Sequence, residues 1–128
     1  MSVKLRRMLQ GKIHGATISS ANLHYEGSIA IPASILDAAG ILPSEAVWVW
    51  NVTNGNRFET YTIVTDEVGH IAVNGAAARL VQPNDKVIVA AFAQMDEQTA
   101  RAHVPSVVFM NDDNSIKQIR AETLSNVV

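Results

Sequence analysis

Short runs in which apolar and polar residues alternate cover much of this chain. The clearest are residues 46–52, where the valines face away from the tryptophans, and Arg57–Thr65. This two-residue period is typical of strands with one buried face. Other runs predict one or two strands within 3–18, interrupted at Gly11 and Gly15, and single strands at 28–32, 70–73, 86–95 and 104–110. The pattern therefore predicts a mainly β protein.

Turn and helix signals separate these runs. Asn54-Gly55 predicts a hairpin turn, because this pair accepts positive φ angles. A short helix is expected over Ser34–Ala39, with Gly40 as a natural stop. Other connections are interpreted as a turn or short helical start (19–22), a loop running into a brief helix (74–81), a polar helix or loop (96–102) and a loosely held polar tail from about Asn111. Short strands joined in this way favour a small closed β-barrel, with residues 1–128 as a single domain.

Composition excludes several classes of function. The 128 residues carry a net charge of −2, so a broad nucleic-acid-binding surface is not expected. The absence of cysteine excludes disulfides, thiolate catalysis and cysteine-bound metals, and it agrees with a reducing cytoplasm. The N-terminus is basic, but no apolar segment of a signal peptide follows it, and no apolar run is long enough to span a bilayer. We therefore expect a cytoplasmic protein without nucleic-acid or membrane partners and without a metal site.

The dipeptide Gly27-Ser28 is the candidate for unusual chemistry. A serine hydroxyl that attacks the preceding carbonyl carbon converts the amide into an ester, and elimination and hydrolysis then leave a pyruvoyl group. Glycine favours the attack because it has no Cβ and tolerates strained backbone angles. The hydroxyl needs activation, and His24 is near it only in sequence. From these residues alone, an ordinary turn into a strand is the more common explanation.

Five separated blocks give this dipeptide a context. In chain order they are Leu23–Ser28, Leu36–Leu42, Trp50–Gly55, Arg57–Tyr61 and Val73–Ala78. In order and spacing they resemble the bacterial aspartate 1-decarboxylase family, over about residues 8–110. The resemblance implies a closed six-stranded double-psi β-barrel with short helices. It also implies a homotetramer with active sites between subunits.

The same resemblance implies a cofactor and a reaction. Self-cleavage between Gly27 and Ser28 leaves a short β chain (1–27) and a longer α chain (28–128) that begins with a pyruvoyl group made from Ser28. Loss of CO₂ from an amino acid leaves a carbanion, which needs an electron sink. In this family the pyruvoyl ketone forms a Schiff base with L-aspartate, and β-alanine and CO₂ are released, which supplies pantothenate and coenzyme A synthesis. A maturation factor is a further partner that the resemblance allows, and we see no signature of pyridoxal phosphate.

Individual residues take roles through the resemblance. Tyr61 matches the proton donor to Cα, since a phenol with a pKa of about 10 holds its proton at neutral pH. Thr60 matches a residue that assists self-cleavage. The substrate-binding set is matched by Lys12, Arg57, Thr60, Asn74, Gly75, Ala76 and Ala77, and the pocket-lining set by His14, Tyr25 and Trp50. Without the resemblance, Tyr61 and Arg57 are ordinary strand residues. Lys12 and His14 share one strand face, which is either an anion site or a solvated exterior.

Two other functions remain open at this stage. Residues 29–43 also resemble swapped-hairpin DNA-binding transcription regulators, although the helix 34–39 carries Asp37 and no basic residue. The other alternative is a folded, tetrameric barrel that is never processed, against which the presence of Ser28, Thr60 and Tyr61 argues. Residues 67–70 depart from the family pattern and are about one residue shorter than it.

Overall fold

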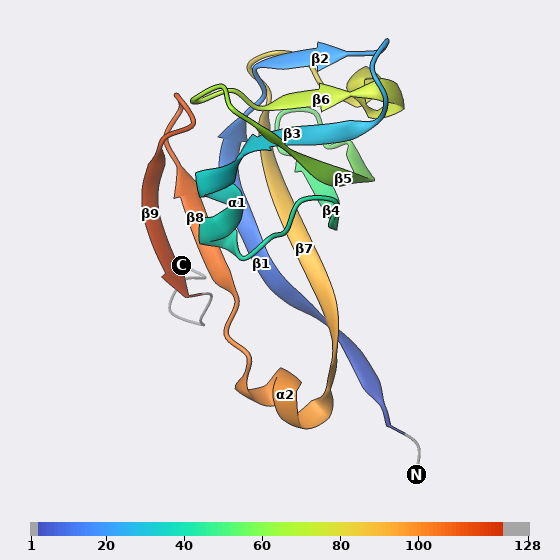
Figure 1. Ribbon diagram of the computed structural model, residues 1–128, viewed down its shortest axis with the longest axis vertical. Helices are drawn as coiled ribbons and strands as arrows, with labels where there is room; N and C mark the ends of the chain where they lie inside the picture. The colour runs from blue at the N-terminus through green and yellow to red at the C-terminus, as the bar shows by residue number, and fades with distance from the viewer. Residues whose placement is uncertain (1–2, 122–128) are drawn as a thin grey trace.

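A computed structural model describes residues 3–121 of the chain (Figure 1). Its strands are β1 (Leu5–Thr17), β2 (Ser20–Asn22), β3 (Ser28–Pro32), β4 (Ala46–Asn51), β5 (Arg57–Thr65), β6 (Ala72–Asn74), β7 (Lys86–Asp96), β8 (Ser106–Met110) and β9 (Ile116–Ala121). Its helices are α1 (Ala33–Ala39), the 3₁₀ helix η1 (Gly75–Leu80) and α2 (Glu97–Ala102). The prediction of a mainly β protein is confirmed.

The strands form one mixed sheet rather than a ring closed by hydrogen bonds. Within residues 3–121 the order is β2-β6-β3-β5-β4-β7-β1-β8-β9, nine strands rather than six, with β2 and β9 at the edges. The long strands β1 and β7 pair antiparallel and extend together toward α2, as Figure 1 shows. β5 joins the two parts of the sheet, because it pairs with β3 and with β4. The double-psi topology stays a prediction.

The core lies beneath the alternating strands and α1. It is built mainly from β-branched residues of several strands, such as Ile13, Ile31 and Val89, together with Phe58 from β5 and Leu36 from α1. α1 ends where predicted, since Gly40 has a left-handed φ of 71° and donates its backbone N–H to the end of the helix. Such a core fixes which face of each strand points outward, and the candidate site is on that outward face.

Two expectations about local structure are wrong. Residues 20–22 form β2 rather than a turn or helical start, because they pair in parallel with β6. The tail from Asn111 is not loosely held as far as residue 121, because β9 pairs with β8. Residues 122–128 of that tail lie outside the described residues. The predicted interruptions of the first strand are register shifts near Gly11 and Gly15 within a continuous β1.

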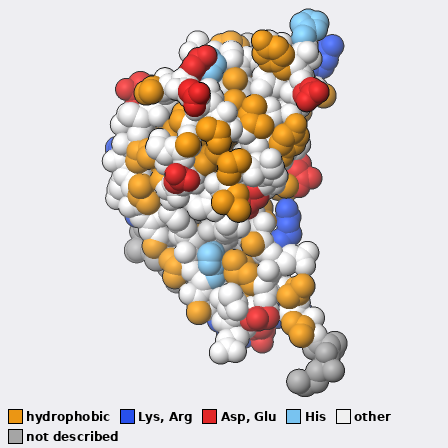
Figure 2. Space-filling model, in the orientation of Figure 1, with side chains coloured by type: hydrophobic (Ala, Val, Ile, Leu, Met, Phe, Trp, Pro, Cys, Tyr) orange, Lys and Arg blue, Asp and Glu red, His pale blue; other side chains and the backbone are white. Residues whose placement is uncertain are grey.

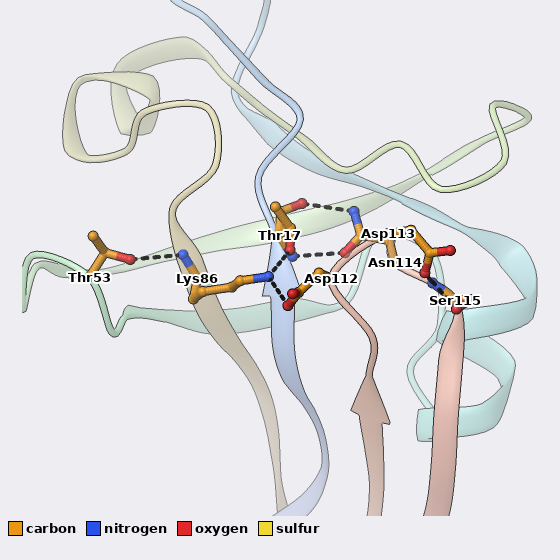
Figure 3. A network of polar contacts seen from close by, with 7 residues as sticks. All are labelled: Thr17, Thr53, Lys86, Asp112, Asp113, Asn114 and Ser115. Carbon is orange, nitrogen blue, oxygen red and sulfur yellow. Dashed lines mark hydrogen bonds and ion pairs between the residues drawn. The ribbon is translucent and has the colours of Figure 1, made fainter.

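A polar network fastens the β8–β9 turn to the rest of the sheet (Figure 3). Asn114 is only 5% exposed and has a left-handed φ of 64°. Its side chain accepts from the Thr17 backbone N–H at 2.7 Å and donates to the Thr17 carbonyl at 2.8 Å and the Gly69 carbonyl at 3.0 Å. Lys86 Nζ contacts Thr17 and lies 2.7 Å from Asp112. The C-terminal turn is therefore fixed to the end of β1 and to the turn before β6.

Candidate active site

Ser28 stands at the start of β3, between two strands that carry other predicted site residues. In the antiparallel pair β3–β6, Ser28 is directly opposite Asn74. In the parallel pair β3–β5, Ile29 is opposite Thr62. The residues that precede these two, Ser28 and Tyr61, therefore lie beside each other. Ile29 and Thr62 are buried in the core, and the alternation therefore turns Ser28, Asn74 and Tyr61 to the other face of the sheet.

The side chains of Ser28 and Asn74 are in direct contact. Asn74 Nδ2 donates to Ser28 Oγ at 3.1 Å, and both residues are buried, with Ser28 only 2% exposed. This bond leaves the serine proton free to point elsewhere and restricts the position of the oxygen. A hydroxyl held in this way next to the Gly27 carbonyl is suited to attack on it.

Gly75 packs against the peptide that precedes Ser28. Its φ is +75°, and a Cβ placed on it would lie 2.7 Å from Gly27 Cα, 2.8 Å from Gly27 N and 3.3 Å from the carbonyl carbon of Glu26. Only glycine allows so close an approach of the two backbones. On Gly27 itself, a Cβ would meet no atom of the described residues within 4 Å. The predicted loop residue Gly75 thus holds the predicted cleavage peptide in place.

An open cavity of about 610 Å³ lies in front of Ser28. Its walls include Tyr25, Gly27, Ser28, Tyr61 and Asn74, which were all predicted as site residues. The volume is within the range of sites that bind small molecules. The structure therefore places five of the thirteen predicted site residues, Ser28 included, on the walls of one cavity.

The predicted carboxylate binders lie elsewhere in the chain. Within residues 3–121, none of Lys12, His14, Trp50 and Arg57 lines the cavity at Ser28. Trp50 and Arg57 line a separate hollow of about 340 Å³ and a second one of about 280 Å³. Arg57 pairs with Trp50, Trp50 pairs with Ile88, and Ile88 pairs with His14, so these side chains follow one row across one face of the sheet. Lys12 is two residues from His14 on that face.

The remaining predicted residues have less direct positions. Thr60 is half-buried and pairs with Val47, on the face of β5 opposite to Tyr61. Ala76 and Ala77 belong to η1, directly after Asn74, with Ala76 exposed and Ala77 packed against the core. Their backbone follows the Gly75 contact, whereas their side chains make no contribution to the walls of the cavity among the described residues.

Sequence reasoning missed three polar residues at the other end of the cavity. Ser20 Oγ lies 3.2 Å from His70 Nε2, and His70 Nδ1 lies 3.3 Å from Glu67 Oε2. All three line the cavity that contains Ser28. Their only signal in the sequence was the departure of residues 67–70 from the family pattern, because Ser20 is distant from the other two along the chain.

Residues 3–121 hold no group of three or more His, Cys, Asp or Glu side chains arranged to bind a metal ion. None of the helices in that range has the length and apolar character to cross a membrane. On the face that Figure 2 shows, the described Lys and Arg side chains are scattered rather than gathered in one patch.

Comparison with known proteins identifies the family of this chain. The family model described as aspartate decarboxylase matches residues 4–117. The chain belongs to the aspartate decarboxylase family. A Clostridium beijerinckii protein named aspartate 1-decarboxylase is 58% identical over 113 residues, which are 88% of this chain and 91% of that protein. Proteins of the same name from Legionella pneumophila (strain Lens) and Hyphomonas neptunium are 54% and 49% identical, over 93% and 87% of this chain and 90% and 95% of theirs.

Membership of the aspartate decarboxylase family confirms the resemblance inferred from the five sequence blocks. The same comparisons give no support to the DNA-binding alternative. The structure agrees with this, because α1, the helix of that alternative, has no basic residue in its last turn and carries Asp37.

Proposed function

We propose that this protein is a pyruvoyl-dependent aspartate 1-decarboxylase, which converts L-aspartate into β-alanine and CO₂. The observation that carries the proposal is the buried Ser28, held by Asn74 and facing a cavity, in a chain of the aspartate decarboxylase family. β-Alanine made in this way supplies pantothenate and coenzyme A synthesis, and the proposed place of the reaction is the cytoplasm. The proposed fold is the double-psi barrel that the family resemblance implies.

The proposed self-cleavage begins at Ser28 and the peptide that precedes it. Ser28 Oγ bonds to the Gly27 carbonyl carbon as the peptide C–N bond breaks, and the hydroxyl proton passes to the released amine. Elimination then frees the chain 1–27 with a terminal carboxylate and leaves a dehydroalanine at position 28. Water adds to this group and ammonia departs, which leaves a pyruvoyl group. Asn74 supports the first step because it positions Oγ, and Gly75 supports it because it holds the Gly27 backbone.

The mature group, once formed, supplies the carbonyl that accepts the electron pair left by CO₂. Tyr61 is 41% exposed, lies beside Ser28 and lines the same cavity, which suits the return of a proton to substrate Cα. Arg57 is suited to bind a substrate carboxylate through two parallel hydrogen bonds, and Lys12 to bind the second. Thr60 is proposed to assist self-cleavage.

The positions of Arg57 and Lys12 support a site shared between two copies of the chain. Arg57 and Tyr61 share one face of β5 and are about 13 Å apart along the strand, at about 3.3 Å per residue. Arg57 also lines a different hollow from Ser28. The smaller of the two hollows beside Arg57, of about 280 Å³, is lined by Arg7, Trp48, Trp50, Arg57 and Phe92. Arginine and aromatic side chains are enriched at protein interfaces. We therefore propose that a second subunit supplies Arg57, Trp50, Lys12 and His14 to the cavity at Ser28, within the homotetramer that the family resemblance implies.

Intact mass and CO₂ release test the enzyme. Wild-type protein, with a maturation factor added where one is needed, should separate into chains 1–27 and 28–128 and release CO₂ from aspartate. Ser28→Ala should abolish both, whereas Ser34→Ala, an exposed serine on α1, should change neither. Cleavage or CO₂ release by Ser28→Ala would refute the role of Ser28.

Complementation tests the shared site. Ser28→Ala and Arg57→Ala should each be inactive alone, but co-expression should restore part of the activity, because some interfaces then combine an intact Ser28 with an intact Arg57. Mixed oligomers that form and remain inactive would refute the shared site.

A further inference from the structure

We infer that the turn Asp66–His70 acts as a clamp on β2 and thereby sets the rate of self-cleavage at Gly27–Ser28. The inference rests on the proposed function, since it concerns the same cleavage. β2 is a three-residue edge strand, and it leads directly into the exposed residues 23–27 that precede Ser28. Whatever holds β2 therefore holds the upstream end of the loop that contains the cleaved peptide.

The clamp, together with Ile71 directly after it, contacts Ser19, which immediately precedes β2, and Ser20, the first residue of β2. The Ser19 backbone N–H donates to the Ile71 carbonyl at 2.7 Å, and the Ile71 backbone N–H donates to Ser19 Oγ at 3.0 Å. Ser19 Oγ also donates to the Gly69 carbonyl at 3.4 Å. Ser20 Oγ contacts His70 Nε2 at 3.2 Å. These contacts supplement the short pairing of β2 with β6, which alone is a weak attachment for an edge strand.

The two ring nitrogens of His70 contact different side chains, Nδ1 that of Glu67 and Nε2 that of Ser20. The Glu67 carboxylate lies 3.3 Å from Nδ1, and a negative group at this distance favours the ring form that carries its proton on Nδ1. In this ring form Nε2 accepts hydrogen bonds, and the Ser20 hydroxyl, 3.2 Å away, is placed to donate to it. Glu67 orients the ring, and the ring in turn fixes Ser20 on β2.

The clamp is itself fixed to the body of the protein. Gly69 has a left-handed φ of 72°, and a Cβ on it would lie 2.9 Å from the Asp113 carbonyl oxygen. Its own carbonyl accepts from Asn114, the buried centre of the network in Figure 3. The clamp therefore connects the β8–β9 turn, through Asn114 and Gly69, to β2, through His70 and Ser20.

The loop 23–27 is thus held at both ends. The clamp holds β2 upstream, and Gly75 packs against Gly27 downstream. Attack of Ser28 Oγ on the Gly27 carbonyl requires a defined approach, and a displacement of about 1 Å can slow such a reaction by about 100-fold. Release of the upstream end should therefore slow cleavage even where the fold is unchanged.

A pair of substitutions at Ser20 isolates the hydroxyl. Ser20→Thr keeps it, and Ser20→Val has the shape of threonine without it, while both side chains suit a strand. Freshly translated protein is followed by intact mass as the 13.8 kDa chain disappears. We expect Ser20→Val to cleave about tenfold or more slowly than Ser20→Thr. Ser106→Ala is the control, because it removes a hydroxyl at the start of β8 that donates to the Ala38 carbonyl at 3.1 Å, outside the network of Figure 3, and it should cleave at the wild-type rate.

A second pair tests the imidazole. His70→Gln keeps a polar group that reaches Ser20, whereas His70→Leu does not, so Gln should restore much of the rate that Leu loses. Equal rates for Ser20→Val and Ser20→Thr would overturn the inference. If Ser20→Val does not fold, equal rates for the two His70 variants would overturn it instead. If the wild-type protein is not cleaved, both the proposed function and this inference are refuted. If the wild type is cleaved but the paired variants cleave at equal rates, the inference alone is refuted.

Discussion

Gly75→Ala is the substitution for which the structure gives the most direct expectation. Position 75 has a φ of +75°, and a left-handed conformation costs a residue with a Cβ about 1–2 kcal/mol. The added methyl group would also lie 2.7 Å from Gly27 Cα, whereas ordinary contact begins near 3.4 Å. The Gly27 backbone must therefore move by about 0.7 Å, and forced overpacking of this kind typically costs about 1–3 kcal/mol more.

The displaced backbone is that of the peptide proposed to cleave. We expect Gly75→Ala to lower the free energy of unfolding by about 2–5 kcal/mol, the combined range of the two costs. Cleavage should slow by about 100-fold, because the Gly27 carbonyl moves away from Ser28 Oγ. Urea unfolding measures the first effect and a time course of intact mass the second.

Gly55→Ala is the matched control for this prediction. Gly55 also has a left-handed φ, of +81°, but a Cβ on it would meet no described atom within 4 Å. It should therefore show the conformational cost alone and cleave at the wild-type rate. Equal cleavage rates for Gly75→Ala and Gly55→Ala would show that the contact between Gly75 and Gly27 does not position the cleaved peptide.

Three further changes test other parts of the molecule. Tyr61→Phe should cleave normally but lose about 10²–10⁴-fold in CO₂ release, and normal turnover would refute its role as proton donor. Asn114→Ala should lower the free energy of unfolding in urea by about 3 kcal/mol, since three hydrogen bonds at about 1 kcal/mol each are lost; a loss below about 1 kcal/mol would contradict this. The backbone N–H of Thr99, which donates to Asp96 at the start of α2, lowers the pKa of Asp96. The contribution of ionised Asp96 to stability is present above the unfolded-state pKa of about 3.9 and is lost as pH falls through the lower folded-state pKa. Asp96→Asn, which lacks this carboxylate, should therefore lose less stability than wild type on acidification, as measured by urea unfolding.

Strands with a strong apolar alternation were predictable from the sequence. Arg57–Thr65 has the predicted bounds, and Gly40 ends α1 as expected. β2 was missed because its three residues become a strand only through pairing with β6, which is distant in sequence. β9 was missed because, beyond Ile116, its residues are exposed and show no buried face. Edge strands of this kind are specified by their partners rather than by their own pattern.

The candidate site was predicted to a similar extent. The sequence blocks identified Ser28, Tyr61 and Asn74, which the sheet register brings together. Periodicity places Arg57 and Tyr61 on one face of β5, but only the pairing of β5 with β3 shows that the Tyr61 end of the strand, and not the Arg57 end, lies beside Ser28. The contact of Ser20 with His70 joins segments that share no motif, so only the structure shows it.

The place of β1 determines what cleavage does to the life of the protein. β1 lies between β7 and β8 in the interior of the sheet, yet it belongs to the 27-residue piece that cleavage would release. After the proposed cleavage, the small fragment would remain paired with the large one on both sides of β1 without any covalent link. Once denatured, however, the processed protein must find its other half by diffusion, so its recovery becomes a second-order process that dilution slows. The proposed maturation would therefore replace a folding reaction within one chain by one in which two chains must meet.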